Sequence, residues 1–517
     1  MAIINSVIAG GGTTPTGTKS ITANGVYDVT DYASADVQVP TTAPTYYKEF
    51  AVDANGKAIN SSVLMNFNGI TDVGDSVFYE LYFRNTDISG LVDMSDLIGV
   101  SGQYGCYRMF GGCTGITSVD LSSLTTVSGS NACYLMFAGD TNITSVDLSS
   151  LTTVSGSNAC NEMFSGCTGI TTVDMSSLTT VGGSNGCSYM FKGCTSITTA
   201  NLPALSTISG SCSYMFQNCI GITTVDLSSL TTISGNCSYM FSGCTGITTV
   251  DLSSLTTASG ANACDTMFKN ITGITSVDLS SLTTISGGYA CREMFSGCTG
   301  PTNLDLSSLT TISNNGAMSM FYGCTGITSV DLSSLITIGN TGCSSMFAVC
   351  SGITSVDMSS LTSIGNSGCS SMFHTCPNLT SVSFPSITSN SFGSYTNQLN
   401  NFCRNASNIT LHFPSNTQAK IETLTGYSTT EPFGAVVGTV LFDLPATYTL
   451  TGADSVTYTR NPKYDTATAL AWKVGAYGTT DFTPAYYTSG TTDPAVGDTI
   501  YSDAACTTAV TTISVIA

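Results

Sequence analysis

The sequence predicts a mainly β protein: a right-handed parallel solenoid of about fourteen coils of about 25–29 residues, with a small β module at each end. Three observations lead to this prediction. One motif, written SGCTGITTVDLSSLTTASGANACDTMF at residues 242–268, recurs along most of the chain. Its apolar residues are spaced as in short strands. The segment before the repeats has Asn-Gly turn chemistry between β-rich runs.

The repeat is anchored by a Met-Phe pair that recurs eleven times, at steps of 25 to 27 residues. The same frame reaches back to Tyr82-Phe83 and forward, in degraded form, to Asn401-Phe402. Such a period is typical of solenoids, in which each unit contacts only its neighbours. The anchoring methionines are Met109, Met136, Met163, Met190, Met215, Met240, Met267, Met294, Met320, Met346 and Met372.

Each repeat contains one short strand whose side chains alternate between the core and the solvent. Val250 and Leu252 flank Asp251, so we expect the two apolar side chains inside and the carboxylate outside. No coil can bury its inner face alone, so stacking must supply the core. The predicted outward residues are Asn66, Asp93, Asp120, Asp147, Asp174, Asn201, Asp226, Asp251, Asp278, Asp305, Asp331, Asp357, Ser383 and His412.

The consensus F-S-G-C-T-G-I-T-T-V-D-L-S-S-L-T-T-I-S resembles the BspA-like leucine-rich repeat, which has an F-x-x-C-x-x-L-x-x-V core. The resemblance covers residues 62–415 and implies a leucine-rich-repeat solenoid. Members of this family are found among bacterial surface adhesins, protist proteins and phage structural proteins. The resemblance therefore indicates the architecture more strongly than the function.

We expect four segments: a β attachment module at 1–46, the solenoid at 47–415, a connector at 416–445 and a C-terminal β module at 446–517. The run GTKSITANGVYDVTDYASADVQVP resembles a module near the start of tail and minor structural proteins of phages that infect Gram-positive bacteria. The segment that begins AWKVGAYGTTDF resembles a terminal module of the same proteins. The connector resembles those that close BspA-like arrays there.

The charge and the distribution of apolar residues disfavour several classes of partner. The formal net charge is -20 with only 13 basic residues, which disfavours nucleic acid and anionic membranes as partners. No run of about eighteen apolar residues exists, so we expect no membrane insertion. The start, MAIINSVIAGGG, lacks the basic region and apolar length of a secretory signal. We therefore expect folding in a host cytoplasm.

Nineteen of the 21 cysteines fall into two files on the repeat, ten of them three residues before the Met and nine three residues after the Phe, which leaves Cys403 and Cys506. Ala317, Ile271 and Asp140 replace single members and leave their partners alone, which disfavours obligate bridges within a coil. Free cysteine packs as a small apolar residue, so we expect reduced core thiols. The C-x6-C spacing also lacks the close pairing of structural zinc sites.

The aligned aspartates have two interpretations. A line of carboxylates about 4.8 Å apart could bind Ca²⁺ or a basic ligand, with Asp226, Asp251, Asp278 and Asp305 as the candidate stripe. The alternative, which we favour, is a solvated strand face whose carboxylates accept local hydrogen bonds and block aggregation. We expect no other cofactor.

No catalytic residues are predicted, and we expect no enzymatic activity. His374 and His412 are the only histidines, and neither belongs to a recognisable nucleophile–base arrangement. No phosphate-binding or dinucleotide motif appears. Coil-specific residues gather instead around the Met-Phe anchor, at lateral positions where recognition could lie. They are Tyr107-Arg108, Asn161-Glu162, Asp265-Thr266, Arg292-Glu293, Lys192, Gln217, Lys269, Tyr322 and His374.

The C-terminal module is rich in aromatic residues, which stack on sugars and dominate binding hot spots. Its candidate ligand-binding residues are Trp472, Tyr477, Tyr486 and Tyr487, although most of these rings could instead form the module's core. The sequence predicts a phage tail fibre or similar virion-surface protein, whose solenoid serves as a rigid spacer or adhesion surface. Its partners would be a host receptor or glycan, other virion proteins and, in a homo-oligomer, further copies of itself. The alternatives are a BspA-like adhesin on the extracellular cell surface and a purely structural filament or decoration protein.

Overall fold

The computed structural model describes residues 70–86, 88–414, 417–428 and 431–443, together with the backbone of short strands at both ends. The described chain is mainly β with almost no helix, and it forms a parallel β-solenoid of about 14 turns. This confirms the predicted fold class. In the predicted attachment module only β1 (Lys19–Ser20) and β2 (Val37–Gln38) are described, as a parallel pair. The rest of that module, and Asn66, lie outside the described residues.

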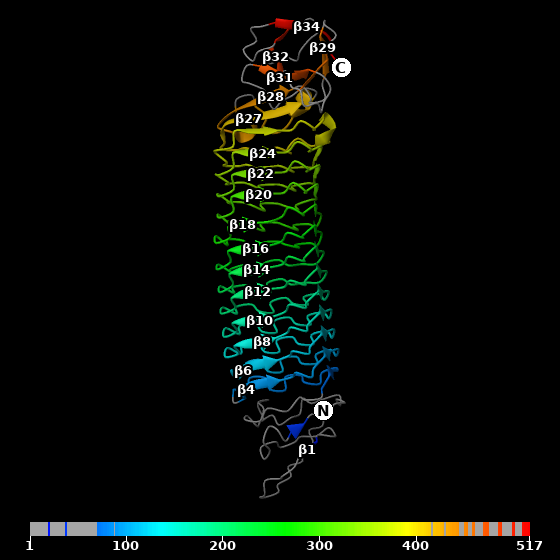
Figure 1. Cartoon of the computed structure of the whole chain (residues 1–517), viewed down its shortest axis with the longest axis vertical. Helices are drawn as coiled ribbons and strands as arrows, with labels where there is room; N and C mark the ends of the chain where they lie inside the picture. Colours follow the sequence, from blue (N-terminus) through cyan, green and yellow to red (C-terminus); the bar gives the residue numbers. More distant parts are fainter. Residues whose placement is uncertain are drawn as a thin grey trace. The chain divides into compact units, whose positions relative to one another are not determined.

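The chain divides into two compact units, residues 1–306 with 312–327 and residues 307–311 with 328–517. In the first unit each coil contributes two short parallel strands, and Figure 1 labels those of the first series. The first strand series, which carries the predicted outward aspartates, comprises β4 (Ser89–Asp93), β6 (Gly115–Asp120), β8 (Ser145–Asp147), β10 (Thr172–Asp174), β12 (Thr199–Asn201), β14 (Thr224–Asp226), β16 (Thr249–Asp251), β18 (Ser276–Val277) and β20 (Asn303–Asp305). The second series comprises β3 (Asp72–Val73), β5 (Gly99–Val100), β7 (Thr126–Val127), β9 (Thr153–Val154), β11 (Thr180–Val181), β13 (Thr207–Ile208), β15 (Thr232–Ile233), β17 (Thr257–Ala258) and β19 (Thr284–Ile285). One more strand, β21 (Thr311–Ile312), contributes one residue to each unit.

Adjacent strands pair in register, so equivalent repeat positions form files. In β14 and β16, Val225 lies opposite Val250, and Asp226 lies opposite Asp251. The valines are buried and the flanking threonine and aspartate side chains point outward. The predicted alternation of inner and outer side chains is confirmed in these strands.

The third side of each coil is neither helix nor strand. It is a series of tight turns, whose residues donate backbone hydrogen bonds in two directions. Leu135 N–H donates to Asn161 O of the following coil at 3.0 Å, whereas Met136 N–H donates to Cys133 O within its own coil at 3.2 Å. Every fourth residue is left-handed, as at Asn131, Leu135 and Gly139. We call this segment the turn ribbon, and the side chains it exposes the turn face.

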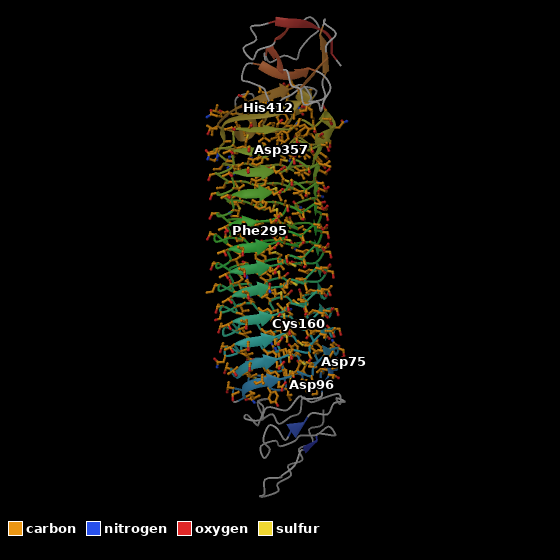
Figure 2. The ribbon with its side chains drawn as sticks, in the orientation of Figure 1. Asp75, Asp96, Cys160, Phe295, Asp357 and His412 are labelled. Carbon is orange, nitrogen blue, oxygen red and sulfur yellow. The ribbon has the colours of Figure 1, made fainter. Side chains whose placement is uncertain are left out.

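The core is a stack of identical side chains. Phe137 lies between Phe110 and Phe164, with ring centroids 5.2 Å away on each side and nearly parallel planes. The methionine before each of these rings is also buried. Figure 2 shows Phe295 and Cys160, two members of these inner files, and both are fully buried. Truncating such a ring to alanine typically costs about 3–5 kcal/mol of stability.

All twenty cysteines among the described residues are free and buried, which agrees with the packing interpretation. Those of the second file also donate hydrogen bonds. The Cys194 Sγ lies 3.1 Å from the carbonyl oxygen of Phe164, and the Cys244 Sγ lies 2.9 Å from that of Phe216. Burial raises the pKa of both thiols. Cys506 lies outside the described residues.

The repeat frame at the first described coil was predicted one residue too late. Tyr82, rather than Phe83, stacks on Phe110, with centroids 5.4 Å apart, and accepts the hydrogen bond from the Cys113 thiol. Phe83 consequently lies beside Gly111 on the turn face and is partly exposed. An apolar ring at either position satisfies the repeat pattern, so the sequence alone could not distinguish them.

The second unit contains a parallel strand series of its own: β22 (Ser329–Asp331), β24 (Ser355–Asp357), β26 (Ser381–Ser383), β27 (Ser407–Pro414) and β28 (Val437–Asp443). It also contains the parallel pair β23 (Thr337–Ile338) and β25 (Ser363–Ile364). The predicted connector therefore supplies one more parallel strand, β28, as well as the short helix α1 (Gln418–Ile421). Two 3-10 turns are η2 (Ser389–Phe392) and η4 (Pro432–Gly434). A closed antiparallel barrel contains β29 (Thr449–Gly452), β30 (Thr457–Arg460), β31 (Ala469–Val474), β32 (Pro484–Thr488), β33 (Thr499–Tyr501) and β34 (Ala509–Ile516).

Candidate functional site

The aspartate file closes local turns. Oδ1 of Asp226, Asp251 and Asp278 accepts a hydrogen bond of 3.0 Å from the backbone N–H of the serine two residues later. The fourth candidate, Asp305, ends β20. Among the described residues, no group of three or more His, Cys, Asp or Glu side chains could hold a metal ion. These local bonds agree with the solvated-face interpretation, and the calcium stripe remains a prediction.

Threonines beside the strands are similarly occupied. Thr231 Oγ1 donates to Ser206 O at 3.1 Å, and Thr256 Oγ1 donates to Thr231 O at 3.0 Å. The same bond recurs in other coils, so the Thr-Thr pairs fasten each coil to the one before it. The strand faces therefore present nearly the same chemistry in every coil.

The turn face differs from coil to coil. In its first described coils it carries an aromatic patch, defined as Tyr79, Phe83, Arg84, Tyr104, Tyr107, Arg108 and Tyr134. Tyr107 stacks on Tyr79 with centroids 4.8 Å apart and on Tyr134 at 5.4 Å, while Tyr104 meets Tyr107 edge-on at 5.5 Å. The guanidinium groups of Arg84 and Arg108 lie 4.9 and 5.2 Å from the centroid of the Phe83 ring.

Further along the same face, three tyrosines form a ladder. Tyr214 stacks on Tyr189 with centroids 4.7 Å apart, and on Tyr239 at 4.8 Å. Burial and the two neighbouring rings raise the pKa of Tyr214. The Lys192 ammonium lies 5.0 Å from the centroid of the Tyr189 ring. The ladder thus combines ring edges, hydroxyl groups and one cation.

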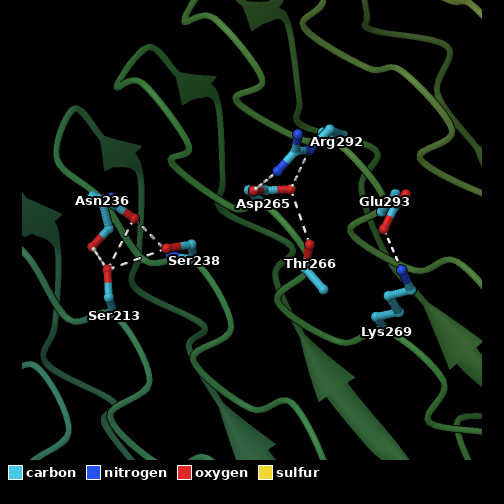
Figure 3. A network of polar contacts seen from close by, with 8 residues as sticks. All are labelled: Ser213, Asn236, Ser238, Asp265, Thr266, Lys269, Arg292 and Glu293. Carbon is cyan, nitrogen blue, oxygen red and sulfur yellow. Dashed lines mark hydrogen bonds and ion pairs between the residues drawn. The ribbon is translucent and has the colours of Figure 1, made fainter.

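A polar network follows the ladder (Figure 3). The Arg292 guanidinium donates two hydrogen bonds to the carboxylate of Asp265, at 2.9 and 2.6 Å, and these bonds raise the pKa of Arg292. Lys269 pairs with Glu293 in the same two coils. The side chain of Asp265 is nearly buried, with 3% of it exposed. Because Asp265 and Arg292 belong to consecutive coils, their ion pair links the two coils.

Several predicted lateral positions therefore share one face, and their pairings were not predicted. Asp265 and Arg292 occupy equivalent positions in consecutive repeats, and this offset of 27 residues was the signal that could have identified the pair. His374 occupies the repeat position equivalent to Lys269, directly after Phe373, in a later coil. It lies near Asn405, and burial followed by the charge of Arg404 lowers its pKa. Trp472 and Tyr486 belong to the adjacent strands β31 and β32, where Trp472 pairs with Ala485. Tyr487 is in β32 as well. The side chains of these three residues, and all of Tyr477, lie outside the described residues.

Two solved structures to which the chain is similar share little of its sequence. A crystal structure of a TLR13–ssRNA13 complex shares 14% identity over 73% of this chain and 62% of that one, with a TM-score of 0.18. The chain thus spans under two thirds of that structure. An internalin (inlF) from Listeria monocytogenes shares 12% identity over 52% of this chain and 82% of its own, also with a TM-score of 0.18. TM-scores this low carry no argument about function.

No curated protein matches the chain. No helix among the described residues is long and apolar enough to cross a membrane. The model of the BspA type leucine-rich repeat region matches residues 106–187, 186–290 and 265–404, which together exceed half of the sequence. The matched residues form the coils whose strands, phenylalanine stack and turn ribbon are described above. The chain therefore belongs to the BspA type leucine-rich repeat family.

Proposed function

We propose that the protein is a non-enzymatic surface protein that binds a partner through the turn face of its coils. One observation carries this proposal: the strand faces repeat the same threonine and aspartate chemistry, whereas the turn face changes from coil to coil. A repetitive scaffold with variable side chains on one face suits recognition.

The composition of the turn face supports the same proposal. Tyr189, Tyr214 and Tyr239 are flanked by serine, asparagine and single charged side chains. Binding surfaces use tyrosine because it offers a large contact area at low cost in conformational entropy, and serine and asparagine because they adapt their hydrogen bonds. Arginine and tyrosine are also enriched among binding hot spots.

Two settings fit this role equally well. Resemblances in the flanking segments support a virion-surface protein such as a tail fibre, which attaches to a host receptor or glycan. Membership of the BspA type family supports a cell-surface adhesin to the same degree. The genes beside this one would discriminate, because tail genes would favour the virion setting. A purely structural filament remains the third candidate and predicts no binding to cells.

The test is binding of the labelled full-length protein to candidate host cells. In a turn-face variant, Tyr189, Tyr214 and Tyr239 are replaced by serine, which other coils carry at Ser319, Ser345 and Ser371. In a matched strand-face variant, Asp226, Asp251 and Asp278 are replaced by asparagine, as at Asn201. We expect the turn-face variant alone to lose binding.

Other outcomes assign the site elsewhere. Loss of binding in the strand-face variant, with sensitivity to calcium chelation, would support the aspartate stripe. If both variants bind, substitution of Trp472, Tyr486 and Tyr487 by alanine in the full chain tests the C-terminal module. Binding by none of the proteins, including the unmodified one, would contradict the proposal on the cells tested and favour the filament.

A further inference from the structure

We propose that the aromatic patch at residues 79–134 binds an acidic saccharide chain. In this proposal Arg84 and Arg108 hold its phosphate or carboxylate groups, and the tyrosine side chains contact its sugar rings. The inference rests on the proposed function and names the ligand class for one part of the turn face.

Arg84 occupies a left-handed position of the turn ribbon, with a φ of 60°. The equivalent residues of the next two coils are Gly112 and Gly139, with φ of 81° and 82°, and other coils carry Asn218 or Val349 there. The left-handed backbone is common to the whole ribbon, so the arginine side chain is what distinguishes this coil. Arg84 is also exposed, so burial does not explain its presence.

Both arginines are held over an aromatic ring and, in the part of the chain that the structure describes, only one of them pairs with a carboxylate. Phe83 has both guanidinium groups near its face, and the small residue Gly111 leaves room for the ring. Arg108 makes a 3.5 Å ion pair with Glu80, while no carboxylate among the described residues forms an ion pair with Arg84. A planar guanidinium that lies over a ring keeps its N–H edge available for a bidentate oxyanion. In a chain with 33 acidic and 13 basic residues, this edge is a local site for an anion.

Several backbone N–H groups of the aromatic patch already donate hydrogen bonds within the solenoid. The N–H groups of Tyr104 and Arg108 donate to Ser130 O and Tyr134 O of the next coil, both at 2.9 Å. The N–H of Tyr107 donates to Tyr104 O at 3.3 Å. A peptide cannot add here as an extra strand, because strand addition needs free main-chain groups at a sheet edge. Recognition must therefore use side chains alone.

The side chains present are tyrosines and arginines, with little aliphatic surface. On this face Leu135 is only partly exposed, so an apolar peptide anchor has no groove to fill. Partly exposed tyrosines supply ring surface and hydroxyl groups, which match the C–H and hydroxyl groups of sugars. Combined with a guanidinium pair, this set fits an acidic saccharide better than an acidic peptide.

The experiment is calorimetric titration of the full-length protein with four short probes. They are a tetrasaccharide with phosphodiester groups, a uronic-acid tetrasaccharide, a neutral glucose tetrasaccharide and a tetraglutamate peptide. We expect binding of at least one acidic saccharide, and the better of the two identifies the anionic group. The neutral saccharide and the peptide should bind at least about tenfold more weakly, the scale of one charge-assisted hydrogen bond.

The variants restore the repeat consensus, so they should fold. Arg84→Gly should weaken binding about tenfold or more, and Tyr104→Asn, which copies Asn131 and Asn158, about threefold. Lys420→Gln is the matched control, because it also removes one cation but lies in α1 and not on the turn face, and it should leave the affinity unchanged. Thermal melting checks that each variant is folded.

Three results would overturn the inference: no probe binds, tetraglutamate binds as tightly as the acidic saccharides, or Arg84→Gly leaves their affinity unchanged. The cell-binding assay separates this failure from failure of the proposed function. If Arg84→Gly binds cells normally while the turn-face variant does not, the turn face still binds the partner and only the ligand assigned to the aromatic patch is wrong.

Discussion

The thiol of Cys167 donates a hydrogen bond of 3.1 Å to the backbone carbonyl of Phe137, which belongs to the preceding coil. Cys160, in the other cysteine file, is equally buried, and its pKa is raised by burial and then by the thiols of Cys133 and Cys187. The two files thus have different surroundings. One faces a main-chain acceptor and the other faces sulfur.

The first prediction follows from this difference. Cys167→Ser should cost little stability, because the hydroxyl can donate to the same carbonyl. Cys160→Ser should cost about 1–3 kcal/mol more, because a buried hydroxyl without a good acceptor keeps its desolvation penalty. Thermal unfolding of the two variants under reducing conditions measures the difference. Equal losses would show that the Phe137 carbonyl does not contribute.

The second prediction concerns Asp140, which replaces a cysteine in the second file. Its side chain is fully buried, and its carboxylate oxygens have no hydrogen-bond partner in the structure. Burial raises the pKa of Asp140 to about 8. Since an unfolded Asp has a pKa of about 3.9, the folded state holds a proton that the unfolded state releases between these values. Stability should therefore fall as pH rises from about 4 to about 8, by several kcal/mol at most.

Asp140→Cys restores the repeat residue and should remove this fall. Burial also raises the pKa of the adjacent thiols of Cys113 and Cys167 far above this window, so they do not titrate within it in the folded state. Thiols of the unfolded chain ionise near about pH 8.5, so the measurement stays below that pH. Melting temperatures at about pH 4.5 and about pH 7 test the prediction in both proteins. If the two proteins lose the same stability between these conditions, Asp140 is not the responsible group.

The third prediction compares adjacent glycines at the corner before the turn ribbon. A Cβ on Gly287 would lie 2.0 Å from the carbonyl oxygen of Gly260, whereas a Cβ on Gly288 would have nothing within 4 Å. Gly287→Ala should therefore destabilise the protein by about 2 kcal/mol or more, because the stacked backbones must separate. Gly288→Ala should be neutral or stabilise by up to about 1 kcal/mol, since it restricts the unfolded chain. Urea unfolding of both variants would refute the close approach if Gly287→Ala were equally neutral.

The strands were predictable because their side chains alternate between core and solvent, and the sequence shows this as an alternation of apolar and polar residues. Val250 and Leu252 lie on either side of Asp251, so the sequence shows which side chains face the core. In-register stacking of the coils then places Asp226 beside Asp251. The turn ribbon was not predicted. Its backbone is set by left-handed residues at every fourth position, and these can be as different as Asn131, Leu135 and Gly139. The spacing of apolar residues along the sequence therefore cannot predict this left-handed backbone pattern.

The candidate site was predictable in position but not in chemistry. Variation around the Met-Phe anchor indicated where coil-specific side chains lie. Which of them meet depends on the register between coils, as in the stacking of Tyr189, Tyr214 and Tyr239. The aromatic patch was further obscured by the one-residue error at Tyr82, because Phe83 was assigned to the core when it lies between two arginines.

The last prediction concerns the ion pair between Asp265 and Arg292. The two side chains differ in exposure, at 3% for Asp265 and 31% for Arg292. Arg292→Ser should cost about 2–3 kcal/mol, because it leaves a nearly buried carboxylate without its cation. Asp265→Ser should cost less than about 1 kcal/mol, because Arg292 can turn toward water or stay over the Tyr289 ring, 4.7 Å away.

The double variant has serine at both positions, the residue that other coils carry at Ser188, Ser213 and Ser238, so it should regain most of the stability. Thermal unfolding of all four proteins, with hydrogen exchange of residues 262–294, completes the cycle. Equal costs for the two single variants would mean that the carboxylate is adequately hydrated and that the pair acts as an ordinary surface salt bridge.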